Sequence, residues 1–255
     1  MIRIGKYVVY DLVRNRFVVM YTAFLMLVTF SVFSLDSDAG KSTLSLLNII
    51  LLVVPVVSVI FTGIHFYNSY EFMELLLSQP VARRTIFFAE YFSVAMALAA
   101  AFLVGAGIPV LVMNFSESST YLVLGGLLLT FVFVALAFAA SVSTRDKAKG
   151  IGIGLLFWFY FTLIYDGFVL YIIYAFSDYP LEKLTLALIT LNPVDLVRII
   201  ILLKLDVSAL MGYTGAFYKS FFGTAVGTVY SIGFVLIWIA APLFYAWKRF
   251  AHKDI

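Results

Sequence analysis

Few side chains in this sequence are suited to covalent or acid–base chemistry. The chain has 255 residues, with two histidines and no cysteine. His65 stands near the end of a long apolar run, where an interfacial or packing role is the simplest interpretation. His252 belongs to the charged tail KRFAHKDI, where solvation is expected. Because no carboxylates are paired at a spacing suited to acid–base work, we expect no catalytic residue and no enzyme activity in this chain.

Asp166, in the segment FTLIYDGFV, has the strongest claim to a role inside a membrane. At 1.5 Å per helical residue, it lies roughly 24 Å beyond Gly150, toward the outer leaflet boundary. An ionisable residue at such a depth suggests a function. We favour a simpler alternative, in which Asp166 bonds a neighbouring hydroxyl group or faces a wet outer cavity beside Gly167.

Nucleotide binding has no support in the sequence. The phosphate-binding pattern G-x-x-x-x-G-K-[ST] does not occur in the chain. The glycines of GIGIG at 150–154 open an apolar run and lack a following lysine, so close helix packing explains them. Any nucleotide chemistry linked to this chain must come from another polypeptide.

The composition specifies the environment of these residues. Apolar residues make up 64% of the chain and charged residues only 12%, about half of what a soluble domain carries. Six apolar runs are long enough to span a bilayer, which predicts an all-α integral membrane domain. The expected spans are approximately 17–35, 44–66, 88–113, 120–141, 151–176 and 226–247.

A seventh apolar stretch, VDLVRIIILLKLDVSALM, does not qualify as a span. Four charged residues interrupt it, each costing about 2.5–3.5 kcal/mol at the centre of a bilayer. They are Asp195, Arg198, Lys204 and Asp206. We therefore predict an amphipathic or short buried helix outside the bilayer, within a long outer segment at 177–225.

The basic residues predict the orientation. With six spans both termini share a side, and twelve of the seventeen lysines and arginines fall on that side. Lysine and arginine are retained on the cytoplasmic face, so we expect both termini in the cytoplasm and the chain in a bacterial inner membrane. The twelve are Arg3, Lys6, Arg14, Arg16, Arg83, Arg84, Arg145, Lys147, Lys149, Lys248, Arg249 and Lys253.

Residues 1–16 are predicted to form an interfacial helix before the first span. Basic residues lie on one face and apolar residues on another, as in helices that lie in the plane of a membrane surface. The simplest role is an anchor for the first span, and the alternative is packing on a cytoplasmic partner. The basic residues are Arg3, Lys6, Arg14 and Arg16.

A compact polar elbow separates the second and third spans at 67–87. Glu71 and Glu74 share one face of a short predicted helix, and an apolar stripe that includes Met73 and Leu77 lies beside them. Pro80 ends that helix. Such a helix is either a plain re-entry loop or a docking element for a cytoplasmic protein. The expected docking residues are Glu71, Met73, Glu74, Leu77, Gln79, Pro80, Arg83 and Arg84.

These features resemble the permease subunit of type-2 ABC transporters. The basic helix ending in DLVRNRF resembles the elbow helix of that family, and YEFMELLLSQPVARRTIFFAEY resembles its coupling region. Within the family, LNPVDLVRIIILLKLDVSALMGYTGAFYK resembles the NosY-like branch, which serves the maturation of the copper sites of nitrous oxide reductase.

The resemblance implies partners that composition and spacing do not reveal. They are a second copy of this chain, two copies of a cytoplasmic ATPase that binds ATP and magnesium, and a periplasmic NosD-like β-helical protein. Membrane lipids are further partners, and nucleic acid is not expected. The polar residues expected to contact the outer partner are Asn192, Asp195, Arg198 and Lys204.

The implied link to copper does not predict a copper site in this chain. Methionine sulfur is the only soft ligand available, and the methionines are scattered without an M-x-x-M pattern. We expect no metal or cofactor in the chain. A mechanical role is therefore favoured, while a sulfur-containing cargo or a path at the dimer interface stays open.

Three functions remain in competition. The first is the membrane subunit of an ABC system, acting either on a small cargo or on a periplasmic partner. The second is a secondary transporter or channel, which usually carries charged residues at mid-membrane, whereas Asp166 is nearly alone and off-centre. The third is an integral-membrane enzyme, which the shortage of histidine, cysteine and clustered acids disfavours.

Overall fold

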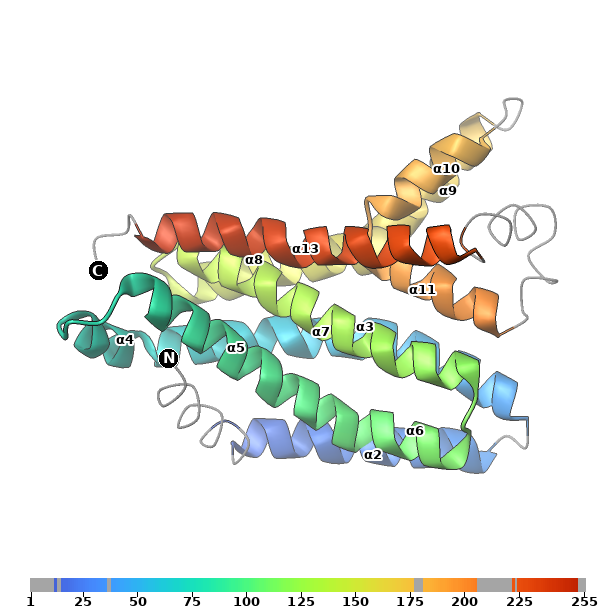
Figure 1. Ribbon diagram of the computed structural model, residues 1–255, viewed down its shortest axis with the longest axis horizontal. Coiled ribbons are helices and arrows are strands. Elements are labelled where there is room, and N and C mark those ends of the chain that lie inside the picture. Colours follow the sequence, from blue (N-terminus) through green and yellow to red (C-terminus); the bar gives the residue numbers. More distant parts are fainter. Residues whose placement is uncertain are drawn as a thin grey trace.

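The chain forms a bundle of long helices, seen in the computed structural model (Figure 1). The structure describes residues 15–35, 38–176, 181–205 and 224–251, together with Leu12 and Phe222. Within these ranges all regular structure is helical, and six helices are long and apolar enough to cross a membrane. The predicted all-α membrane fold with six spans is therefore confirmed.

The spans agree with the expected runs but extend further at several ends. The second covers 30 residues and the third 31, more than the approximately 20 that a bilayer requires, so these helices tilt or project. The helices are α2 (Arg16–Leu35), α3 (Ala39–Asn68), α4 (Tyr70–Leu77), α5 (Arg83–Phe102), α6 (Ile108–Met113), α7 (Glu117–Ser143), α8 (Lys147–Phe159), α9 (Tyr165–Ala175), α10 (Glu182–Thr190), α11 (Pro193–Lys204) and α13 (Ala225–Ala251).

Two spans contain a π-helical turn. The turn η1 (Leu103–Gly107) joins α5 to α6, and η2 (Tyr160–Ile164) joins α8 to α9. Such insertions often lie at functional positions. In η1, a Cβ atom on Gly105 would lie 2.7 Å from the carbonyl oxygen of Thr22, so glycine lets α2 approach closely.

Polar side chains cap the starts of several helices. The Asp38 carboxylate accepts a hydrogen bond from the Gly40 amide at the start of α3, and Asp146 accepts one from Lys149 at the start of α8. The Ser116 hydroxyl accepts one from the Ser119 amide at the start of α7. These caps satisfy amides that have no partner within their helix, which explains where the spans begin.

Helix α7 is the centre of the bundle. Of its most apolar stretch 78% is buried, against 22% for α2, for the α8–α9 span and for α13. α7 packs against α3, α13, α11, α8 and α5. Near its C-terminal end, the Phe138 ring lies edge-on to Phe66, Phe87 and Tyr91 at centroid distances of 5.7, 5.9 and 5.7 Å. Aromatic packing therefore joins α3, α5 and α7 at this end.

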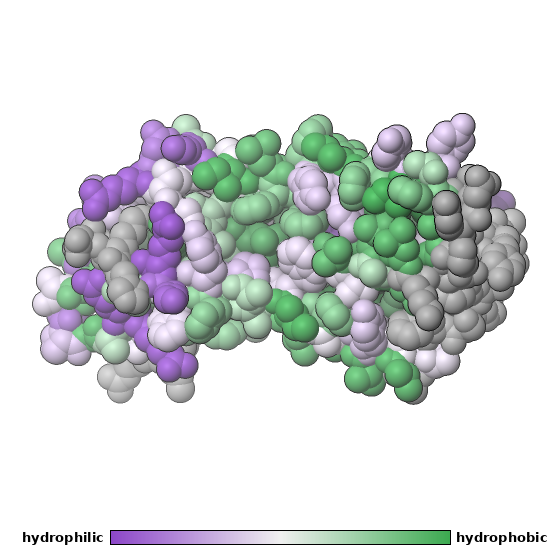
Figure 2. Space-filling view, turned by 90° about the horizontal axis from the view of Figure 1, so that it is seen from above, coloured by the Kyte–Doolittle hydropathy of each residue, from purple (hydrophilic) through white to green (hydrophobic). Residues whose placement is uncertain are grey.

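The two ends of the bundle differ. Helix α4, the start of α2 and the end of α13 lie at one end, which we name the α4 end, whereas α10 and α11 lie toward the other (Figure 1). In the space-filling view, hydrophilic side chains gather at the α4 end and hydrophobic ones cover the middle (Figure 2). This distribution fits a bundle whose middle lies in lipid.

Helix α11 has the form of the short buried helix that the sequence allowed, and it packs against the spans. α10 and α11 bend by 112° into a broken helix pair, and α11 packs against α7 and α13. A Cβ atom on Gly125 of α7 would lie 2.6 Å from Val197 and 3.0 Å from Ile201. α11 therefore lies alongside the first half of α7. Three of the charged residues in this segment, Asp195, Arg198 and Lys204, form ion pairs within the chain.

Candidate functional site

Helix α4 projects from the bundle at the α4 end and is held by two buried side chains. Met73 is 2% exposed and Leu76 is 8% exposed, and both lie on the face that packs toward α3 and α5. The predicted helix with an apolar stripe is present, and it ends at Leu77, before Pro80. Because Met73 is buried within the chain, the structure corrects its expected role: it fixes α4 instead of meeting a partner.

The outer face of α4 combines acids with apolar side chains. Glu71, Glu74 and the following Gln79 and Pro80 are exposed. Phe72 and Leu75, which the sequence analysis did not single out, are 46% and 65% exposed; Leu77 is half-buried. Phe72 and Leu75 are three residues apart, which places them on one face of the helix. This spacing is the signal that could have identified them. This mixed surface is what a docking helix presents to a groove.

Arg83 and Arg84 open α5 and are tied to the end of α13. The Arg84 guanidinium lies 5.6 Å from the ring centre of Trp247 and 5.7 Å from that of Phe88. Arg83 donates a hydrogen bond to the Ala251 carbonyl at 3.3 Å. Both arginines are exposed, so they stabilise the end of the bundle beside α4 while remaining accessible.

A buried hydrogen bond between a histidine and a glutamate lies just inside the α4 end. Nε2 of His65 on α3 and Oε2 of Glu90 on α5 are 2.9 Å apart, and their side chains are 14% and 3% exposed. The Ser69 hydroxyl lies 3.3 Å from the same nitrogen. The packing role expected for His65 thus takes the form of a hydrogen bond between two helices. The sequence analysis missed Glu90, although an acid seven residues into an apolar helix is a visible signal.

The Ser69–His65–Glu90 arrangement is not that of a catalytic triad. In a triad the acid binds one ring nitrogen of histidine while the serine binds the other. Here both partners contact Nε2 of His65, so the imidazole has no second nitrogen engaged to relay a proton between them. The group holds helices together instead of activating a nucleophile.

A second polar cluster lies beside α11. Nη1 of Arg198 is 2.8 Å from Oδ2 of Asp166 on α9 and 3.0 Å from Oδ1 of Asp195. Asn192 donates to Asp195 and to the Phe161 carbonyl of η2, both at 2.9 Å. Its Oδ1 accepts a bond from the amide that starts α11. The cluster therefore ties the bend between α10 and α11 to the fifth span.

This cluster corrects two expectations. Asp166 was expected to bond a hydroxyl or face a wet cavity, whereas its partner is a guanidinium. Asn192 and Asp195 were expected to contact an outer protein, but they are 0% and 8% exposed, so their side chains serve the chain itself. Arg198 and Lys204 keep side-chain exposures of 28% and 27%, so an outer contact through them stays a prediction.

The predicted interfacial helix cannot be compared with the structure. Arg3, Lys6 and Arg14 lie outside the described residues. Arg16, expected in the same helix, is the exposed first residue of α2. Leu12 is 1% exposed and its side chain belongs to the apolar core.

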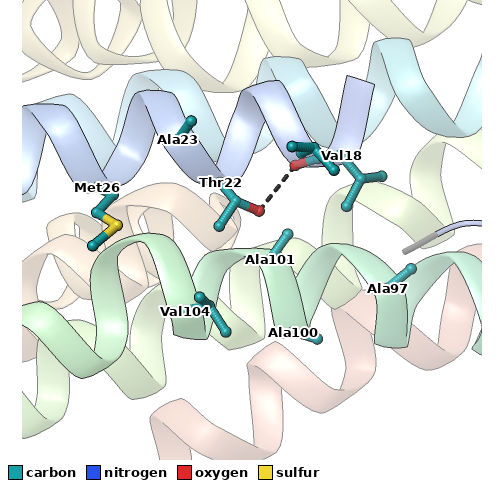
Figure 3. Close-up of a pocket in the computed structure, with 9 residues that line it drawn as sticks. Val18, Thr22, Ala23, Met26, Ala97, Ala100, Ala101 and Val104 are labelled. Atoms are coloured by element: carbon teal, nitrogen blue, oxygen red, sulfur yellow. Dashed lines mark hydrogen bonds between the residues drawn. The ribbon is translucent and has the colours of Figure 1, made fainter. Parts of the chain in front are cut away.

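A shallow apolar groove of about 390 Å³ runs between α2 and the α5–η1 segment (Figure 3). The Thr22 hydroxyl donates to the Val18 carbonyl at 2.9 Å, so the lining presents an apolar surface. Such a groove suits apolar chains and not a polar cargo. It is lined by Val18, Val19, Thr22, Ala23, Met26, Ala97, Ala100, Ala101 and Val104.

In the described ranges, no three His, Cys, Asp or Glu side chains gather closely enough to hold a metal ion.

The comparison with protein families adds to these observations. The family model described as "ABC-2 family transporter protein" matches residues 9–255. None of the curated proteins matches the chain. The match covers nearly the whole sequence and agrees with the six-span helical fold. The chain therefore belongs to the ABC-2 transporter family, whose members are multi-pass membrane subunits of ABC transporters.

Proposed function

We propose that this chain couples ATP hydrolysis by a separate cytoplasmic ATPase to movement of the membrane spans, and that α4 is the contact between the two subunits. ATP and magnesium would bind to the ATPase. The observation that carries this proposal is the exposed face of α4, with Glu71 and Glu74 beside Phe72 and Leu75. A helix of this size, anchored by buried side chains, can enter a groove and transmit a push.

We further propose that the α4 end lies in the cytoplasm of a bacterial cell and that the span bundle crosses the inner membrane. The support is the distribution of charge, because cytoplasmic loops keep an excess of lysine and arginine. Eight basic residues in the described part of the chain lie at the α4 end. They are Arg16, Arg83, Arg84, Arg145, Lys147, Lys149, Lys248 and Arg249.

The working unit that we propose contains two copies of this chain and two copies of the ATPase, as membership of the family implies. The α8–α9 span supports this, because only 22% of its most apolar stretch is buried. Its exposed face carries Phe159, Tyr160 and Tyr171, which are 44%, 42% and 68% exposed. Aromatic side chains of this kind are enriched at interfaces between chains.

The finer role that we propose is in the maturation of the copper sites of nitrous oxide reductase, by mechanical action on a periplasmic NosD-like β-helical protein. Its support is the resemblance of residues 191–219 to the NosY-like branch. Export of an unrelated small cargo is the alternative. Genes next to this one that encode a P-loop ATPase and a secreted β-helical protein would favour the first role, and their absence would favour the second.

The experiment is a charge reversal on α4. A tagged chain is purified in mild detergent from its own host, and the co-purifying P-loop ATPase is identified by mass spectrometry. Glu71→Arg with Glu74→Arg should abolish co-purification and leave membrane insertion intact. Glu117→Arg, at the opposite end, is the matched control and should retain the ATPase. An ATPase still bound to the double variant would refute docking through α4.

A second measurement separates this function from ATPase-independent transport. Arg198 forms ion pairs with both Asp166 and Asp195, so the expected isolation of Asp166 no longer counts against a secondary transporter. The chain is reconstituted into liposomes without an ATPase, and ion flux is measured under an imposed gradient. We expect no gradient-driven flux, and a clear flux would favour the secondary transporter.

A further inference from the structure

The loop that carries α4 is closed at its base by one side-chain bond. α4 is connected on one side to α3 and on the other to α5. His65 lies on α3 four residues before Ser69, and Glu90 lies on α5 seven residues after Arg83. Their 2.9 Å contact therefore joins the two helices that flank α4, just inside the point where they enter the bundle.

Ser69 connects this bond directly to α4. Ser69 occupies the N-cap position of α4, but its side chain makes no cap hydrogen bond there. Its hydroxyl lies instead 3.3 Å from Nε2 of His65, and its amide donates to the His65 carbonyl at 2.9 Å. The Ser69 carbonyl in turn accepts from the Met73 amide, which begins the helical ladder of α4. A displacement of α4 thus acts first on His65.

The environment makes the bond stiff. Glu90 is 2% exposed, and a buried carboxylate that loses its partner incurs a large desolvation cost. The imidazole of His65 is also stacked on the ring of Phe61, at a centroid distance of 6.3 Å. Phe61 is itself stacked on Phe17 of α2 at 5.2 Å. Neither partner can therefore turn away without losing packing or hydrogen bonding.

The other anchors of α4 are of a different kind. Met73 and Leu76 bury apolar surface, and such contacts are non-directional, so they permit a helix to slide or tilt. A hydrogen bond such as that between His65 and Glu90 has a preferred distance and angle. The apolar anchors therefore keep α4 attached, while this hydrogen bond determines in which direction α3 and α5 follow it.

We propose that His65 and Glu90 are positioning residues for energy coupling: their bond makes α4 and the starts of α3 and α5 move as one body. This inference rests on the proposed function, because it takes α4 to be the point at which the ATPase acts. It assigns a role to Glu90 that neither the family match nor the docking face of α4 requires.

The test uses spin labels, for which a chain without cysteine is a suitable background. Nitroxides are attached at Leu75→Cys on α4 and at Phe115→Cys near the opposite end; these positions are 65% and 85% exposed. Electron–electron resonance on the full chain in nanodiscs gives their distance distribution. The ends of α7, with 27 residues, are separated by about 40 Å, a range that this method measures.

Glu90→Leu should broaden the distance distribution at least twofold. Glu90→Gln should keep the native width, because its side-chain amide can still form a hydrogen bond with Nε2 of His65. The double variant His65→Leu with Glu90→Leu removes both partners of the bond, so neither is left buried alone, and it keeps the test valid should Glu90→Leu fold poorly. The double variant should be no broader than the single variant, since both remove one bond. Glu117→Leu, which removes the acceptor of Lys204 at the opposite end, is the matched control and should change nothing.

The same variants are then measured in the complex with the ATPase. Glu90→Leu should retain ATPase binding, since the exposed face of α4 is unchanged, and should lose the distance change that ATP with vanadate produces in the native chain. Unchanged distance distributions in Glu90→Leu and in the double variant would overturn the inference while leaving docking intact. Failure of the native chain to bind an ATPase would overturn the proposed function, and the link to coupling with it.

Discussion

Asp166 of α9 and Arg198 of α11 form an ion pair, with Oδ2 and Nη1 2.8 Å apart, that joins the fifth span to the broken helix pair. Arg198 also contacts Asp195 at 3.0 Å. One guanidinium therefore serves two carboxylates, and the cluster carries one negative charge more than positive when both carboxylates are ionised. Substitution of Arg198 and substitution of Asp166 change this charge balance in opposite directions, so their effects on the stability of the chain can be compared.

Arg198→Leu should destabilise the chain more than Asp166→Asn. Removal of the guanidinium leaves two carboxylates without a counter-charge, which we expect to cost about 2–4 kcal/mol, at or below the usual range because the pair is partly exposed. Asp166→Asn leaves the Arg198–Asp195 pair balanced and should cost about 1 kcal/mol or less. The measurement is unfolding in mixed detergent micelles with increasing dodecyl sulfate. Equal stabilities of the two variants would contradict the shared guanidinium.

Gly126→Ala should destabilise the centre of the bundle. A Cβ atom at this position of α7 would lie 2.2 Å from Cζ of Phe102, a side chain that is fully buried. The aromatic ring must shift, at a cost of about 1–3 kcal/mol. Gly152→Ala is the matched control, since nothing lies within 4 Å of its added Cβ. Thermal unfolding in detergent should show a lower midpoint for the first variant alone, and identical midpoints would argue against this close approach.

Single cysteines should react from opposite sides of the membrane. Leu75→Cys on α4 is expected to react with a membrane-impermeant maleimide only after the inner membrane is permeabilised. Phe115→Cys, between α6 and α7, should react in intact spheroplasts. The physical reason is the excess of basic residues at the α4 end. Labelling of Leu75→Cys in intact spheroplasts, with Phe115→Cys protected, would reverse the orientation and remove α4 from the cytoplasm.

Much of the fold could be predicted from local features of the sequence. The six spans follow from the length and hydropathy of their runs, because a bilayer imposes a minimum length on any helix that crosses it. The boundaries follow from short polar caps such as Asp38 and Asp146, which act on amides two or three residues away. The short helix before Pro80 was predictable for the same reason, since proline acts on its immediate neighbours.

The partners of the buried charges could not be predicted in this way. Glu90 finds His65 at a separation of 25 residues, and Asp166 finds Arg198 at 32. No periodic pattern encodes such distances, because they depend on how whole helices pack. The sequence alone determined that this chain spans a membrane and bears a short polar helix between its second and third spans. Only the tertiary structure decided that α11 packs inside the bundle and that Met73 faces inward, because pairing and burial depend on neighbours distant in the chain.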